Sequence, residues 1–166
     1  MSRVRCFAPV ADANATILIL GSMPGKESLR AQQYYAHPRN AFWQILGELI
    51  GAAPTLAYEQ RLHLMRAAGI ALWDVLASCA RTSSLDSDID NCTLVSNDFA
   101  SFFAYHRKIA RVFFNGAKAE DCYRKHVLPT LSDTPLAYQR LPSTSPANAS
   151  LSYKRKLAAW KTVAQK

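Results

Sequence analysis

The sequence has no long hydrophobic run. Nowhere do about eighteen apolar residues follow one another, the length at which a helix becomes a candidate membrane span. The first residues, Met-Ser-Arg-Val-Arg-Cys, also lack the apolar core of a secretory signal. We therefore expect a cytoplasmic protein that does not enter a membrane.

Closely spaced cysteines are also missing. The sequence has no C-x-x-C pair and none of the Cys–His spacings of a zinc site. Its cysteines are Cys6, Cys79, Cys92 and Cys122. We expect four free thiols that pack as small buried hydrophobes, and neither a metal nor another cofactor.

Acidic residues are few beside the basic ones. Asp and Glu number 12 against 20 Lys and Arg, which gives a net charge of +8. The resulting field attracts polyanions such as nucleic acid or an acidic membrane face, but many basic proteins bind no nucleic acid. The length of 166 residues suits one domain, residues 1–166, with a single sizeable core.

Apolar segments of strand and helix type alternate along the chain. Predicted strands cover residues 16–20, 70–76, 109–114 and 136–141. Predicted helices cover residues 41–50, 56–68, 96 or 97 to 106, 116–127 and 150–164. The Ser-, Thr-, Asp- and Asn-rich stretch 78–97 is predicted to be a long surface connection with a functional role. The alternation predicts an α/β fold, a three-layer α/β/α sandwich around a mostly parallel four-stranded sheet.

Unusual residues follow the predicted strands, at the sheet edge where open α/β proteins bind ligands. Gly21-Ser-Met-Pro-Gly25 suits a wall of main-chain donors and acceptors, although the segment taken alone is better explained by a tight strand-to-helix turn. Asp74 interrupts an apolar run, where a charge needs either a partner or a ligand. Asn115 precedes Gly116 and is either a ligand contact or a turn residue. The segment 141–148 follows the last strand.

The segment 33–43 combines aromatic, cationic and amide side chains before a helix. Its aromatic residues are suited to stack on a base, and His37 or Arg39 to contact phosphate. Asn40 is placed to cap the helix, which does not exclude a catalytic role.

Three motifs together carry a family resemblance. They are Gly-Ser-Met-Pro-Gly, Tyr-Tyr-Ala-His-Pro-Arg-Asn-Ala-Phe-Trp and Leu-Pro-Ser-Thr-Ser-Pro. With them the chain resembles the uracil-DNA glycosylase superfamily, and is most similar to its hypoxanthine-DNA glycosylase branch. The resemblance implies a monomeric, monofunctional enzyme that flips a deaminated base out of DNA and hydrolyses its glycosidic bond. Hypoxanthine is the expected base, with uracil and xanthine as further candidates.

The resemblance also implies roles for individual residues. The catalytic role falls on Asn40, whose amide can orient water and donate to the base or sugar. Tyr35 is expected to stack on the extruded base, and Asp74 to accept the N1–H of hypoxanthine. The base-binding set is Gly21, Ser22, Met23, Tyr35, Asp74 and Asn115, and the DNA-binding set is His37, Arg39, Ser143, Thr144, Ser145 and Pro146.

The chain departs from other branches at two positions. Met23 stands where mismatch-specific uracil enzymes have Asn, and Leu141 stands where classical uracil enzymes have His. Uracil excision by the classical route is therefore not expected. The alternatives are a mismatch-specific uracil-DNA glycosylase, a non-catalytic nucleic-acid-binding protein on the same fold, and a hydrolase of free nucleotides.

Overall fold

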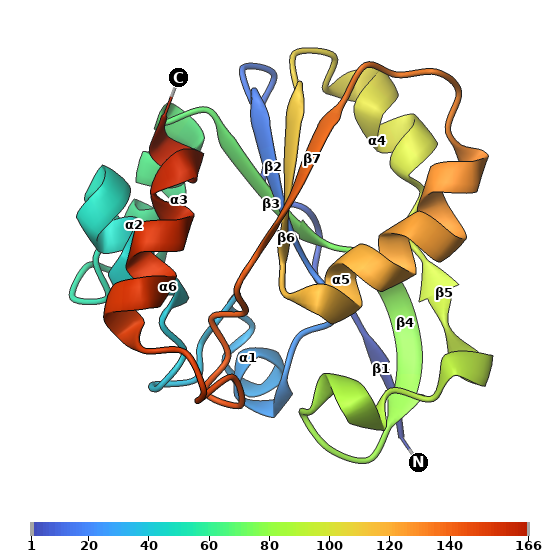
Figure 1. Cartoon of the computed structure of the whole chain (residues 1–166), viewed down its shortest axis with the longest axis horizontal. Coiled ribbons are helices and arrows are strands. Elements are labelled where there is room, and N and C mark those ends of the chain that lie inside the picture. The colour runs from blue at the N-terminus through green and yellow to red at the C-terminus, as the bar shows by residue number, and fades with distance from the viewer. Residues whose placement is uncertain (1, 166) are drawn as a thin grey trace.

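The main sheet is parallel. The computed structural model describes residues 2–165, and its four-stranded sheet has the order β3-β2-β6-β7. The strands are β2 (Ile17–Gly21), β3 (Ile70–Asp74), β6 (Arg111–Asn115) and β7 (Ala137–Leu141). All four point toward the same end of the molecule (Figure 1). The predicted strands are thus present, with bounds that differ by a few residues.

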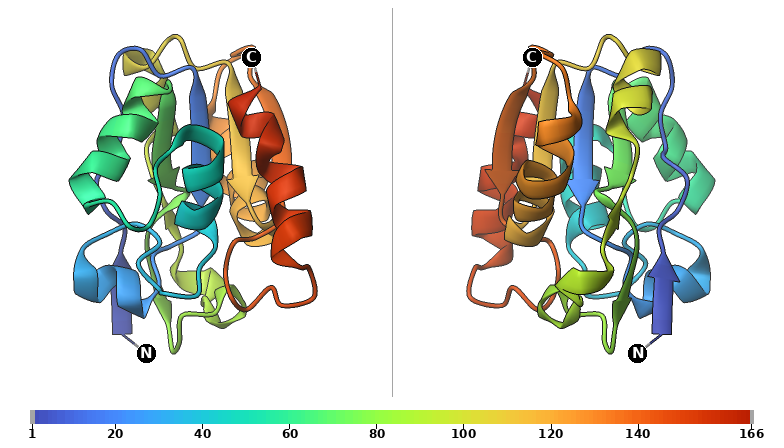
Figure 2. Two further views of the ribbon diagram at one scale, coloured as in Figure 1. Left: turned by 90° about the vertical axis from the view of Figure 1, so that its left-hand side faces the viewer. Right: turned by 90° about the vertical axis from the view of Figure 1, so that its right-hand side faces the viewer.

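Helices cover both faces of this sheet (Figure 2). One face carries α2 (Phe42–Ile50), α3 (Tyr58–Ala67) and α6 (Tyr153–Trp160), and the other carries α4 (Phe99–Tyr105) and α5 (Ala117–Cys122). Ile17 and Ile19 of β2 pack on the first side, whereas Leu18 and Leu20 pack on the second. Because successive side chains of a strand alternate between faces, a strand covered on both sides is apolar throughout. The predicted three-layer sandwich is confirmed.

A second, antiparallel sheet was not predicted. It consists of β1 (Ser2–Arg5), β4 (Leu76–Arg81) and β5 (Val95–Ser96), in the order β1-β4-β5. The chain leaves β3 at Asp74 and enters β4 at Leu76, so the predicted strand 70–76 is two strands. The prediction of a surface connection from residue 78 is therefore wrong for β4, whose Cys79 is fully buried. Pairing with β1, far away in the sequence, stabilises this strand.

Some helix ends also differ from the predictions. A short helix, α1 (Lys26–Ala31), follows the first motif. Asp98, and not residue 96 or 97, caps α4, because its carboxylate accepts from the Ser101 backbone N–H at 3.1 Å. Asn97 instead donates to the Asp74 carbonyl at 2.8 Å. Past α5 the chain continues as π and 3-10 turns, Tyr123–Val127 and Leu128–Thr130, and past α6 as the 3-10 turn Lys161–Ala164.

The four cysteines are free but not all buried. Cys79 and Cys122 are buried as predicted, whereas Cys6 is half-buried and Cys92 is exposed. The prediction is wrong for Cys92 because it lies in the exposed 3-10 turn Asn91–Thr93. Among residues 2–165 no helix has both the length and the apolar character to cross a membrane.

Candidate functional site

The carboxyl ends of the parallel strands form one side of a cleft of about 1140 Å³. In the sheet register Gly21 pairs with Asp74, and Asn115 pairs with Leu141. Every residue of the predicted site lines this cleft: Gly21, Ser22, Met23, Tyr35, His37, Arg39, Asn40, Asp74, Asn115, Ser143, Thr144, Ser145 and Pro146. Segments that are far apart in the sequence therefore meet where the motifs predicted.

The floor of the cleft is the first motif. The backbone N–H groups of Val75 and Leu76 donate to the carbonyls of Gly21 and Ser22, at 2.8 and 3.2 Å. A Cβ at position 21 would lie 2.6 Å from the Asp74 Oδ1 and 2.9 Å from the Tyr35 hydroxyl. These distances are shorter than a carbon atom tolerates, so only glycine lets the two polar groups approach this backbone.

Asp74 is a buried carboxyl that forms no ion pair with any residue from 2 to 165. It is 4% exposed, and its Oδ2 has no hydrogen-bond partner among residues 2–165. Burial raises the pKa of Asp74 to about 7, with a further contribution from the negative charge of Asp86 and an opposing one from Arg81. Asp86 is itself held in place, because the Ser22 hydroxyl donates to its Oδ1 at 2.5 Å.

The Tyr35 hydroxyl also lies close to the Gly21 backbone. One face of its ring stacks on Phe42, with centroids 4.1 Å apart and planes at 25°. Its φ of 56° lies in the left-handed region, at a cost of about 1–3 kcal/mol, and such strain concentrates at functional sites. Burial, and then the charge of Asp74, raise the pKa of the Tyr35 hydroxyl, against a smaller opposing effect of the Asn115 side chain. The ring can therefore offer only its second face to a ligand.

Asn40 lies at the beginning of α2. The side-chain Oδ1 of Asn40 accepts from the Phe42 backbone N–H at 3.0 Å. The backbone N–H of Asn40 donates to the His37 backbone carbonyl at 2.9 Å. Because an amide oxygen has two lone pairs, this contact leaves Oδ1 one more acceptor position. The N-cap position of α2 is Ala41, so the predicted cap at Asn40 is one residue off; Asn40 forms a turn just before the helix, and its side chain lines the cleft.

Asn115 and Thr144 form two hydrogen bonds with each other. The Asn115 Nδ2 donates to Thr144 Oγ1 at 3.0 Å, and the Thr144 N–H donates to Asn115 Oδ1 at 2.9 Å. Thr144 is only 1% exposed, and its hydroxyl already accepts from Asn115. The Thr144 carbonyl in turn accepts from the Ala41 N–H at 3.0 Å, next to Asn40.

The DNA-binding residues of the prediction occupy the walls. Arg39 is exposed, and its backbone N–H donates to His37 Nδ1 at 3.0 Å. Ser143, Ser145 and Pro146 are half-buried, with the Ser143 hydroxyl accepting from the Ser145 N–H at 3.2 Å. These groups border the cleft without filling it.

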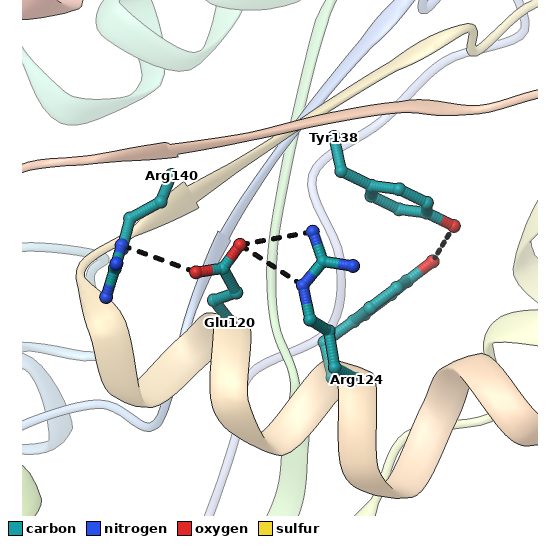
Figure 3. Close-up of polar contacts among 5 residues, drawn as sticks. Glu120, Arg124, Tyr138 and Arg140 are labelled. Atoms are coloured by element: carbon teal, nitrogen blue, oxygen red, sulfur yellow. Dashed lines mark hydrogen bonds and ion pairs between the residues drawn. The ribbon is translucent and has the colours of Figure 1, made fainter.

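Sequence reasoning missed several parts of the lining, among them residues 117, 118 and 121 of α5. Two others bring further charged side chains to the cleft. The first is residues 84–87, including Asp86, within the polar stretch that was predicted to have a functional role. The second is Arg140, one of the last residues of β7. Figure 3 shows Glu120 of α5 between Arg140, at 3.3 Å, and Arg124, at 3.2 Å. The sequence did offer a signal for Arg140, because it is a basic residue near the end of a predicted strand.

The comparisons with known proteins agree with this geometry. The family model described as the Uracil DNA glycosylase superfamily matches residues 8–165. The chain belongs to the uracil DNA glycosylase superfamily. A protein of Methanosarcina acetivorans named hypoxanthine DNA glycosylase is 39% identical over 160 residues, 96% of each chain. A protein of the same name from Methanosarcina barkeri is 40% identical over 114 residues, 68% of this chain and 71% of its own.

A solved structure is similar over the whole length. It is the solution NMR structure of a candidate uracil DNA glycosylase from Methanosarcina acetivorans, with a TM-score of 0.81 and 36% identity, covering 99% of this chain and 98% of that one. Within this superfamily fold, the first motif, Asn40 and the segment 142–148 lie around one cleft.

Proposed function

We propose that this protein is a DNA glycosylase that hydrolyses the bond between 2-deoxyribose and hypoxanthine in DNA. The observation that carries the proposal is that all the motif residues meet at one cleft in a member of the uracil DNA glycosylase superfamily. The names of the two Methanosarcina relatives support hypoxanthine as the base. Uracil and xanthine share the cyclic N–H/C=O edge of hypoxanthine and are further candidate substrates.

The reaction needs a water molecule at the sugar and a place for negative charge on the departing base. Asn40 is the proposed catalytic residue. Its Oδ1 is held by the Phe42 N–H, so the amide is oriented and a water can bind at the remaining lone pair. The bond between C1′ and the base breaks with its electron pair going to the base, and the water oxygen bonds to C1′.

The base would enter between the first motif and Tyr35. The free face of the Tyr35 ring is available for stacking, because Phe42 covers only the other face. Ser143 and Ser145 of the 142–148 segment are placed to contact the backbone of DNA, and Pro146 to occupy the space vacated by the base. We propose that the protein acts as a monomer, since one chain contains all these groups.

The test is an excision assay on duplex oligonucleotides that carry a single deoxyinosine, uracil or xanthine. Abasic products are cleaved with alkali and counted. We expect strand cleavage at deoxyinosine, and a loss of at least about a hundredfold in rate for Asn40→Ala, the size of effect seen when one well-placed polar group is removed. Cleavage chiefly at uracil would reassign the substrate, and DNA binding without cleavage of any substrate would contradict an enzymatic role.

Two control variants separate catalysis from the hydrogen bond to the Phe42 N–H. Asn40→Ser keeps an oxygen that can accept from the Phe42 N–H, but lacks the amide, so it should remain inactive with nearly wild-type thermal stability. Asn14→Ala changes an exposed asparagine just before β2, at the end of the sheet opposite the cleft, and should retain full activity. Recovery of activity in Asn40→Ser would show that Asn40 serves only to hold the turn before α2.

A further inference from the structure

One ionisable group inside the cleft has no partner to account for its burial. Asp74 is 4% exposed, and no Lys, Arg or His of residues 2–165 forms an ion pair with it. Its Oδ2 lacks a hydrogen-bond partner in the described part of the chain, although the neighbouring Oδ1 lies next to the Gly21 backbone in the floor of the cleft. An unpaired buried carboxylate is costly, and the neutral acid is the form that such a position favours.

Groups around Asp74 also favour its neutral form over the ionised one. Asp86 approaches from the 3-10 turn after β4, and Ser22 fixes its carboxylate by a 2.5 Å hydrogen bond. Tyr34 and Tyr35 face Asp74 from the segment before α2, and Cys6 from the segment after β1; all are neutral in their ordinary state.

Arg81 of β4 is a cation that acts on Asp74, and its effect is smaller than that of burial and of Asp86. The Arg81 guanidinium donates to the Pro24 carbonyl and not to Asp74. The surroundings of Asp74 are therefore apolar and negative on balance, which favours the protonated carboxyl.

We propose that Asp74 meets the extruded base as a neutral carboxylic acid, with the O–H carried on Oδ1, the oxygen beside Gly21, and donating to the base carbonyl. In hypoxanthine this carbonyl oxygen is O6. The inference rests on the proposed function and assigns the protonation state in which this residue works.

The neutral acid helps the reaction as well as binding. When the C1′–N9 bond breaks, its electron pair goes to N9 and spreads over the purine to O6, where the Asp74 O–H stabilises it. Asp74 keeps its proton throughout. The attacking water bonds to C1′ and releases its proton to solvent, and the departing purine takes up a proton from solvent. An ionised Asp74 would instead place a negative charge against O6 and oppose the departure.

The first measurement is the single-turnover excision rate on deoxyinosine DNA between about pH 5.5 and pH 8.5, a range that brackets the raised pKa of Asp74. The neutral acid is present below that pKa and disappears above it. We expect a rate that is highest at low pH and falls by about tenfold for each pH unit above the pKa. A rate that is constant or rises across this range would overturn the proposal.

Three substitutions assign the pH dependence to this carboxyl. Asp74→Asn presents a permanent N–H donor beside a carbonyl acceptor, so its slower rate should no longer fall as pH rises, whereas Asp74→Ala should lose activity at every pH. Asp86→Asn removes the neighbouring negative charge but can still accept from Ser22, so the decline should move to lower pH. An unchanged decline in Asp74→Asn would assign the titration to another group.

These outcomes are distinct from failure of the proposed function. If Asn40→Ala abolishes excision but Asp74→Asn keeps the wild-type pH profile, the glycosylase assignment is supported and the proposed role of Asp74 is wrong. If wild-type protein excises no base at any pH, the proposed function itself fails. Urea unfolding of each variant at both ends of the pH range checks that the fold is retained.

Discussion

At the scale of single residues, the site depends on how closely polar groups approach one glycine. Gly21 ends β2, and both the Asp74 carboxyl and the Tyr35 hydroxyl lie where its side chain would begin. Tyr35 reaches this place through a left-handed backbone conformation. Gly25 belongs to the same motif, but its Cβ would meet only Ser84 atoms at 3.5 Å, an ordinary contact.

This difference predicts opposite results for two glycine-to-alanine changes. Gly21→Ala should displace Asp74 and Tyr35, with a stability loss of about 1–3 kcal/mol from overpacking and a loss of most excision activity. Gly25→Ala should keep its activity and most of its stability. Urea unfolding and single-turnover rates on deoxyinosine DNA measure both. Equal activities of the two variants would show that the close approach at Gly21 does not matter.

At the scale of elements, the segment 142–148 is held from three sides. Asn115, which ends β6, bonds both to the Thr144 hydroxyl and to its backbone N–H. From α6, the Trp160 indole donates to the Pro142 carbonyl at 2.9 Å and the buried Lys156 ammonium to the Ser145 carbonyl at 3.3 Å. Since Thr144 also accepts from Ala41, the segment is coupled to the beginning of α2 and hence to Asn40.

We predict that Thr144→Val weakens both the fold and the reaction. The isosteric valine leaves the buried Asn115 Nδ2 without an acceptor, which should cost about 1–3 kcal/mol in urea unfolding. The displacement of the segment should lower the single-turnover rate by at least about tenfold, equivalent to ~1.4 kcal/mol. Thr144→Ser restores the hydroxyl and should recover both. A stability loss without a rate loss would mean that this contact supports the fold only.

At the scale of the whole molecule, the chain has a net charge of +8, and some of its basic residues lie at the rim of the cleft. Arg39, Lys26 and Arg140 all border the cleft and are exposed. Glu120 bonds to Arg140, whose side chain is 54% exposed, so this pair contributes little to stability and mainly orients the guanidinium (Figure 3).

Arg140→Ala should therefore change DNA binding and not folding. If Arg140 contacts one phosphate, the slope of log K against log salt concentration should become shallower by about 0.9. The control is Arg107→Ala, an exposed arginine between α4 and β6, at the end of the sheet away from the cleft. Titrations of labelled duplex at several salt concentrations measure the slopes. The same slope for wild type and Arg140→Ala would place this residue outside the DNA contact.

The sequence by itself determined the parallel sheet and most of the residues that line the cleft. Strands buried on both faces must be apolar throughout, and polar residues after such runs must gather at one edge, so both features are visible locally. The tertiary structure alone decided the pairing of β4 with β1, the bond of Asn115 to Thr144 across 29 residues, and the approach of Asp86 to Asp74. Contacts between distant segments leave no periodic pattern in the chain, and burial, which sets the charge of Asp74, exists only after those segments have packed together.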